Sequence, residues 1–158
     1  MGEKGKSNQE LAREILAAAG AATLATLTAE GGPFASYVVT ATDADGAPLM
    51  LLSALAEHAK NLARDPRASL LFVREPEAGS EAMTAARLTL TGRATKDADL
   101  ENRRRYVARH PDAARYADFS DFALYRFEIG AGHLVAGFGR IVALSREQLL
   151  IGCRHARA

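Results

Sequence analysis

Cysteine is nearly absent from this sequence of 158 residues, and clustered metal ligands are absent too. The one cysteine, Cys153, has no second thiol with which to form an internal disulfide, and its neighbours are basic residues rather than metal ligands. The four histidines, His58, His110, His133 and His155, show no ligand-type spacing. We therefore expect neither a disulfide-stabilised scaffold nor a metal site.

The sequence also lacks an excess of either charge and lacks a long hydrophobic run. The 20 Lys and Arg residues balance 19 Asp and Glu residues to a net charge of +1, without the electropositive surplus of non-specific nucleic-acid binding. No apolar run approaches the roughly 18 residues that cross a bilayer, and residues 1–10 lack the apolar segment of a secretory signal. We therefore expect a cytoplasmic protein without a nucleic-acid or membrane partner.

The sequence has the length and composition of one globular domain. Hydrophobic residues make up 48% and charged residues 25% of the chain, and a chain of this size can bury one sizeable core. We predict a single domain over residues 1–158, with a core from about residue 10 to residue 150.

Turn signals divide the chain into short segments that alternate between two periodicities. Glycine, proline and aspartate separate runs of β-branched and aromatic residues from runs with apolar residues at helical spacing. Gly92 is a candidate β-bulge, and Ser145 with Gln148 forms a capping box for a short last helix. We predict helices over residues 10–19, 53–64 and 97–110, and strands over residues 21–28, 34–42, 48–52, 68–73, 87–95, 122–129 and 134–138. This order does not alternate as a doubly wound sheet does, and it favours a mainly β (α+β) fold, a small antiparallel barrel with peripheral helices.

Familiar catalytic and nucleotide-binding motifs are missing. The sequence contains no Gly-x-Ser-x-Gly elbow and no phosphate loop, and the glycines of Gly137-Phe138-Gly139 are not followed by a third glycine that opens a helix. One junction has the groups that a phosphate monoester needs: Ser53 at a strand end, followed by a helix with His58 and Lys60. The alternative is a helix-capping serine followed by solvent-exposed basic residues.

A set of ordered segments gives a more specific indication. They are PFASYVV (33–39), DGAP (45–48), LLS (51–53), HAKNL (58–62), DPRASL (65–70), RLTLTGRA (87–94), RHP (109–111), DFALY (121–125) and GFGR (137–140). Together they resemble the pyridoxamine-phosphate-oxidase-like split barrels that bind FMN. They are most similar to the branch that also contains haem-utilisation and haem-degrading proteins.

The resemblance implies a six-stranded antiparallel split β-barrel with peripheral α-helices. It also implies a homodimer with one FMN in each of two clefts between protomers. It assigns cofactor binding to Ser36, Tyr37, Val38, Val39, Ser53, His58, Lys60, Asn61, Arg87 and Phe138. In that assignment Ser36, Tyr37 and Val38 line the flavin, whereas Ser53, His58 and Lys60 hold the phosphate. Arg87 reaches the flavin ring, and Phe138 approaches from the other subunit or packs in the dimer interface.

Three functions remain open at this point. The leading hypothesis is an FMN-dependent oxidoreductase acting on an unidentified small molecule, in which the flavin performs the redox chemistry and no residue is named as catalytic. The second is a haem-binding or haem-degrading protein that uses the same cleft, with His133 or His155 as the iron ligand. The third is a non-catalytic flavin-binding module.

Overall fold

The computed structural model describes residues 5–137 and 139–152, which form seven strands and four α-helices. In chain order the elements are α1 (Asn8–Ala18), β1 (Ala21–Leu27), β2 (Pro33–Thr42), β3 (Pro48–Ser53), α2 (Glu57–Arg64), β4 (Arg67–Val73), η1 (Ala82–Thr84), β5 (Arg87–Lys96), α3 (Leu100–Arg109), η2 (Pro111–Arg115), β6 (Phe122–Val135), β7 (Ile141–Ser145) and α4 (Arg146–Leu149).

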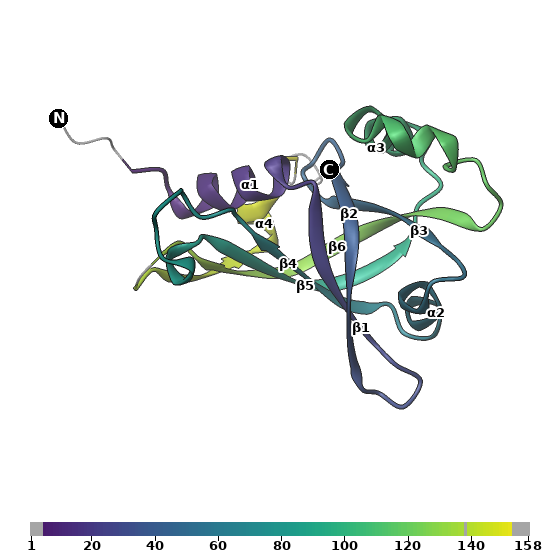
Figure 1. The fold of residues 1–158 in the computed structure, drawn as a ribbon, viewed down its shortest axis with the longest axis horizontal. Helices are drawn as coiled ribbons and strands as arrows, with labels where there is room; N and C mark the ends of the chain where they lie inside the picture. Colours follow the sequence, from purple (N-terminus) through teal and green to yellow (C-terminus); the bar gives the residue numbers. More distant parts are fainter. Residues whose placement is uncertain (1–4, 138, 153–158) are drawn as a thin grey trace, which may run out of the picture.

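The strands form one antiparallel sheet that closes on itself (Figure 1). Their order is β3-β2-β1-β4-β5-β6-β7, and a further pairing of β3 with β6 closes the first six strands into a barrel. Strand β7 lies outside the closed barrel, paired with β6. The predicted six-stranded antiparallel barrel with peripheral helices is thereby confirmed, with one additional strand.

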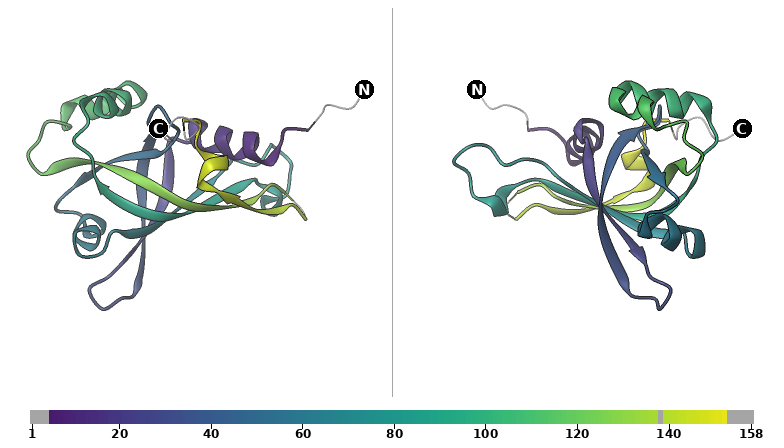
Figure 2. Two further views of the ribbon diagram at one scale, coloured as in Figure 1. Left: turned by 180° about the vertical axis from the view of Figure 1, so that it is seen from behind. Right: turned by 45° about the vertical axis from the view of Figure 1, so that its right-hand side comes forward.

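Alternating residues of the strands fill the barrel. Leu24, Leu70 and Leu90 are register partners on β1, β4 and β5, and all three are fully buried. Helices α1 and α2 add Ile15 and Leu62 to the same core. Helix α3 packs instead on the outside, against β2 and β3, where Tyr106 belongs to a second, smaller cluster. The three helices therefore cover separate parts of the barrel (Figure 2).

Strand β6 differs from the prediction. The sequence predicts two strands, over residues 122–129 and 134–138, but one strand runs without interruption from Phe122 to Val135. The strand continues through a β-bulge at Gly130, which has no register partner, because Thr91 pairs with Ala131 and Gly92 pairs with Ile129. A Cβ atom on Gly92 would lie 2.0 Å from the Glu128 carbonyl oxygen, so the bulge requires glycine there. The predicted irregularity at Gly92 is confirmed, although the extra residue is Gly130 on β6. The expected break in β6 is wrong, and β7 was not predicted.

Helix α2 begins four residues later than predicted. Ser53 remains in β3, paired with Phe122, and the helix starts at Glu57 after a turn. Ala56 occupies the N-cap position and has no capping side chain. The two capping boxes, at Ser7 and at Ser145, are present. Within the described residues, no helix is both long and apolar enough to cross a membrane.

Candidate functional site

Two of the predicted site residues meet at the barrel wall. Ser36 lies on β2, opposite Leu24 of β1, and His58 lies in the first turn of α2. The Ser36 Oγ and His58 Nδ1 atoms are 2.9 Å apart. Burial lowers the pKa of His58, which favours the neutral imidazole at neutral pH. The structure therefore joins β2 and α2 through a hydroxyl–imidazole hydrogen bond.

Lys60 and Asn61 follow His58 in the same helix but face different surroundings. The side chain of Lys60 is about half exposed, and its Nζ lies 3.8 Å from a Glu57 carboxylate oxygen. Asn61 is completely buried and donates from Nδ2 to Thr26 Oγ1 at 3.0 Å. Asn61 Oδ1 accepts a hydrogen bond from Arg64. The polar groups of Asn61 are thus engaged inside the protein.

Ser53 is bonded within its own turn. Its Oγ donates to Asp121 Oδ2 at 3.1 Å and accepts from the backbone N–H of Leu55 at 3.2 Å. Ser53 therefore fixes the connection from β3 to α2 and does not stand at the first turn of the helix.

The remaining predicted residues are dispersed. Val38 is buried in the barrel core, whereas Tyr37 is 75% exposed on the outer side of β2 and Val39 is half-buried. Arg87, at the start of β5, donates to the carbonyl oxygens of Met83 and Ala85. Phe138 lies outside the described residues, as does His155.

The exterior of the sheet carries a continuous row of side chains that the sequence analysis did not identify. Strand register aligns one residue from each of six strands, from β2 to β7: Tyr37, Thr23, Leu71, Thr89, His133 and Ala143. Period-2 alternation showed which residues share a face of each strand, but the alignment across strands depends on register, which the sequence does not give.

Two neighbouring rows extend this surface, which we call the outer sheet face. One row adds Ala35, Ala25, Ser69, Thr91, Ala131 and Ser145, and the other adds Val73, Arg87, Val135 and Ile141. None of these residues is acidic, and the only ionisable groups other than the Tyr37 phenol are the Arg87 guanidinium and the His133 imidazole. Tyr37, Leu71, Val73 and Ile141 are exposed. Apolar surface of this kind typically marks a contact with a ligand or another chain.

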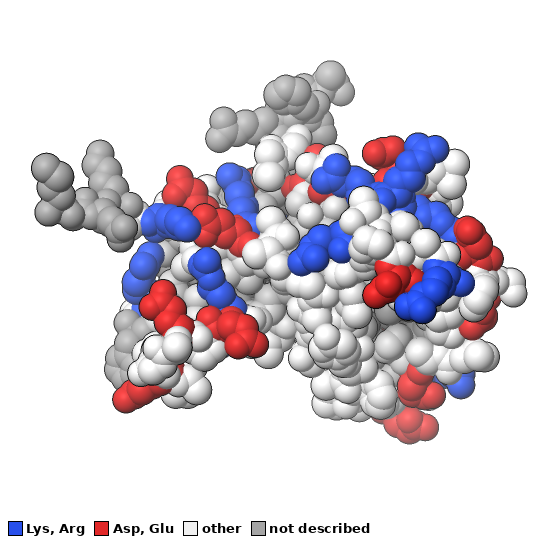
Figure 3. All heavy atoms as spheres, turned by 45° about the horizontal axis from the view of Figure 1, so that its top comes forward, with Lys and Arg blue, Asp and Glu red and all other residues white. Residues whose placement is uncertain are grey.

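The surface near α1 and α3 has a different character. Figure 3 shows basic and acidic side chains mixed on that side of the molecule. In residues 5–137 and 139–152, no group of three or more potential metal-ligating side chains is found. His133 is therefore a single exposed imidazole in uncharged surroundings rather than part of a metal-ligand cluster.

The chain is similar to proteins with haem-related names. It is 40% identical over 111 residues to the non-canonical heme oxygenase HOZ, a chloroplastic protein of Arabidopsis thaliana, covering 68% of this chain and 33% of that protein. It is 27% identical over 135 residues to the heme oxygenase HutZ of Vibrio cholerae, covering 80% of this chain and 75% of HutZ. The chain thus spans a third of the length of the Arabidopsis protein.

Solved structures with a similar fold include another protein with a haem-related name. A heme binding protein from Mycobacterium smegmatis superposes with a TM-score of 0.84 at 37% identity, covering 93% of this chain and 61% of the other. A Clostridium acetobutylicum protein of the pyridoxinephosphate oxidase family superposes with a TM-score of 0.67 at 12% identity, over 90% of this chain and 99% of the other. The second likeness supports the split-barrel fold alone.

These relatives correct the leading functional hypothesis. The sequence analysis favoured an FMN flavoprotein with oxidoreductase activity, but the named relatives are heme oxygenases and a heme binding protein. The split-barrel resemblance indicated the fold correctly, and the fold is shared by proteins with different cofactors, so it could not specify flavin. The haem alternative is the better supported of the two.

A family model agrees with the fold and covers almost the whole chain. The model described as CREG, beta-barrel matches residues 3–149, which include all seven strands. The chain therefore belongs to the CREG β-barrel family.

Proposed function

We propose that this protein binds haem and degrades it. The observation that carries the proposal is the 37% identity to a mycobacterial heme binding protein over 93% of this chain. Two further relatives, at 40% and 27% identity, are named heme oxygenases. Of the functions left open by the sequence, we therefore prefer the haem-binding or haem-degrading one to the FMN-dependent oxidoreductase.

The outer sheet face has side chains that fit a haem group. Haem needs an apolar wall for its macrocycle, a nitrogen ligand for its iron and cations for its propionates. On this face Tyr37 and Leu71 present exposed apolar surface, His133 presents an exposed imidazole, and Arg87 presents a guanidinium. Bound haem would supply the iron centre for oxygen chemistry. The protein's own residues would hold the macrocycle and limit the access of water.

We also propose that the protein is a homodimer and that its protomers meet through the outer sheet face. A single protein surface leaves one side of a planar ligand in water, whereas two such surfaces enclose it. The apolar side chains of Tyr37, Leu71, Val73 and Ile141 would be covered in the same contact. This arrangement retains the dimer cleft expected from the sequence and assigns it to haem.

Titration with ferric haem tests the binding. The unaltered protein should shift the Soret band saturably, and His133→Ala should weaken the binding at least about tenfold, because the axial nitrogen is lost. His110→Gln is the matched control, since His110 Nε2 bonds the Thr40 carbonyl oxygen beneath α3, away from the outer sheet face. If haem binding is lost only in His155→Ala, the axial ligand of the iron is His155 and not His133. No saturable shift in the unaltered protein would overturn the proposal.

Degradation is measured in the same samples. With ascorbate as electron donor and dissolved oxygen as oxidant, the Soret band of the bound haem should disappear over time, and catalase should not prevent its loss. A stable Soret band under these conditions would leave a haem-binding protein without oxygenase activity and would contradict the second half of the proposal.

A further inference from the structure

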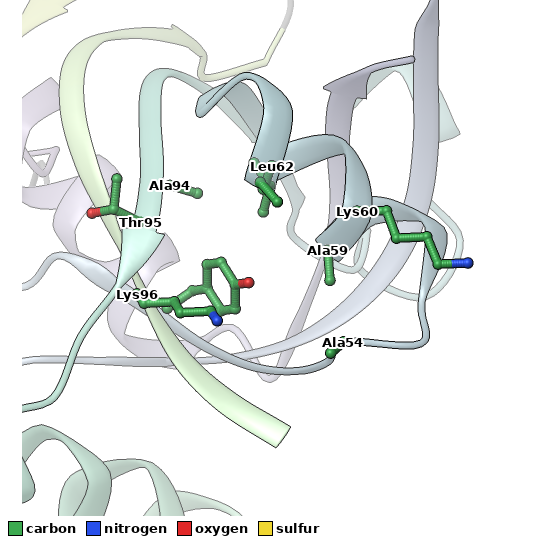
Figure 4. A pocket seen from close by; sticks show the side chains of 9 residues that line it. Ala54, Ala59, Lys60, Leu62, Ala94, Thr95 and Lys96 are labelled. Carbon is green, nitrogen blue, oxygen red and sulfur yellow. The ribbon is translucent and has the colours of Figure 1, made fainter. Parts of the chain in front are cut away.

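A pocket between α2 and the far ends of β5 and β6 is separate from the outer sheet face. Its volume is about 420 Å³, within the range of small-molecule sites. It is lined by Ala54, Ala59, Lys60, Leu62, Ala63, Ala94, Thr95, Lys96 and Tyr125 (Figure 4). Four of these nine residues, Ala54, Ala59, Leu62 and Ala63, are alanine or leucine on α2 or in the turn before it, so one wall of the pocket is apolar.

The tyrosine Tyr125 is part of this lining. Tyr125 is only 5% exposed, and among the described residues no hydrogen bond to its hydroxyl group is found. Burial raises the pKa of Tyr125, so the phenol keeps its proton and remains a donor. The hydroxyl group is thus a donor that lines the pocket, and a ligand acceptor in the pocket could accept its hydrogen bond.

Positive charge lies beside that hydroxyl. Lys96 is the register partner of Tyr125, and no carboxylate of the described residues lies within ion-pair distance of its amino group. The adjacent Asp97 is engaged elsewhere, since its carboxylate accepts from the Asp99 N–H and from Asn102. Figure 4 shows the amino group of Lys60 directed away from the pocket. The pocket therefore offers one cation, the Lys96 amino group, next to one neutral donor, the Tyr125 hydroxyl.

We propose that this pocket binds a small apolar molecule carrying one carboxylate. The carboxylate accepts hydrogen bonds from the Tyr125 hydroxyl and the Lys96 amino group, and the apolar body lies against Ala59, Leu62 and Ala63. A phosphate dianion would find only one cation, whereas a monocarboxylate is matched in both charge and acceptor geometry. The site is independent of haem and goes beyond the function proposed above.

Octanoate is a suitable probe because it joins a flexible apolar chain to one carboxylate. Binding to the full chain is followed by calorimetry, and two-dimensional NMR locates the residues whose signals shift. The expected result is one saturable site with shifts at Ala59, Leu62 and Ala94. Octanol, which has the same chain without the charge, should bind at least about tenfold more weakly.

Two variants and one control test the roles of the residues. Tyr125→Phe removes only the hydroxyl oxygen and should weaken octanoate binding about tenfold. Ala63→Leu, on the exposed side of α2, fills the pocket without touching the barrel core and should abolish binding. Lys96→Met should also weaken binding, whereas Lys6→Met, which removes one charge near α1, should not. The Soret titration of Ala63→Leu should match that of the unaltered protein.

Three outcomes would overturn the inference. They are equal affinity for octanol and octanoate, NMR shifts confined to the outer sheet face, and undiminished octanoate binding in Ala63→Leu. Because haem binding is measured separately in the same variants, a failure here leaves the haem proposal unaffected.

Discussion

Asp43, next to the β2–β3 turn, is a buried carboxylate that accepts three hydrogen bonds. It is only 6% exposed, and its Oδ1 accepts from the backbone N–H groups of Asp45 and Ala47 at 2.9 Å each. Its Oδ2 accepts from Arg126 Nε at 2.6 Å, which ties the turn to β6. One side chain thus fixes a turn and an ion pair at the same time.

Replacing Asp43 should therefore be costly. Asp43→Ala leaves the Arg126 guanidinium and two backbone donors without their partner, so the free energy of unfolding should fall by about 3 kcal/mol. Urea denaturation followed by circular dichroism measures the loss. Asp118→Ala, which removes an exposed carboxylate paired with Arg103, is the control and should change little. Equal effects of the two substitutions would contradict this account.

His58 gives the protein a pH dependence with a definite sign. Burial lowers its pKa in the folded state below the usual 6.5, while the unfolded chain keeps the usual value. The unfolded state therefore binds more protons as the pH falls below 6.5, and stability decreases in that direction.

This pH dependence is tested by comparing the unaltered protein with a variant that lacks the His58 imidazole. The free energy of unfolding should decrease as the pH falls below 6.5, and this decrease should be smaller in His58→Asn, where no group titrates. NMR titration of the His58 ring should give a pKa below 6.5. A ring pKa above 6.5, or an unchanged pH slope in the variant, would contradict the assignment.

Some helices, strands and turns can be predicted from the neighbouring sequence alone, and others cannot. The predicted strands leave turns at residues 29–33 and 43–47, and the glycines there, Gly31 and Gly46, adopt positive φ angles of 80° and 92°. The capping box at Ser145 was predicted because its partner lies three residues away, and the structure has a second one at Ser7. Strand β6 was not predicted as one strand, because Gly130-Ala131-Gly132 has the composition of a turn. The pairing of Ala131 and Gly132 with β5, next to the bulge at Gly130, keeps the strand continuous.

The candidate site depends mainly on contacts between segments that are far apart in the sequence. The closeness of Ser36 and His58 follows from the packing of α2 on the barrel, and only the family resemblance placed them together beforehand. The row from Tyr37 to His133 depends on pairing between strands that are distant in the sequence, such as β1 with β4. Neither composition nor periodicity encodes that register.

The bulge between β5 and β6 provides a test at the level of one element. A Cβ atom on Gly92 would lie 2.0 Å from the Glu128 carbonyl oxygen, so Gly92→Ala forces β5 and β6 apart. We expect a loss of about 3 kcal/mol or more in unfolding free energy. Gly5→Ala, where a Cβ would meet nothing within 4 Å, is the matched control. A Gly92→Ala variant as stable as the control would show that the bulge can relax.

The whole molecule has two sides of opposite character. Charged side chains of both signs cover the region of α1 and α3, whereas the outer sheet face is almost uncharged. A soluble monomer would gain nothing from exposing Tyr37, Leu71, Val73 and Ile141 together. The distribution of charge thus favours an assembly in which this face is covered, and it is the physical argument for the proposed homodimer.

A charge placed in the centre of that face should separate the protomers. Leu71 is flanked by Thr23 and Thr89, so Leu71→Glu puts carboxylates of both protomers into an apolar contact where they would be desolvated without partners. Sedimentation should then give the mass of one chain, in place of twice that mass for the unaltered protein. Leu100→Glu, at an exposed apolar residue at the start of α3, is the control and should remain dimeric. If haem is held between two such faces, Leu71→Glu should also lose the Soret shift. A Leu71→Glu protein that stays dimeric would place the contact elsewhere on the molecule.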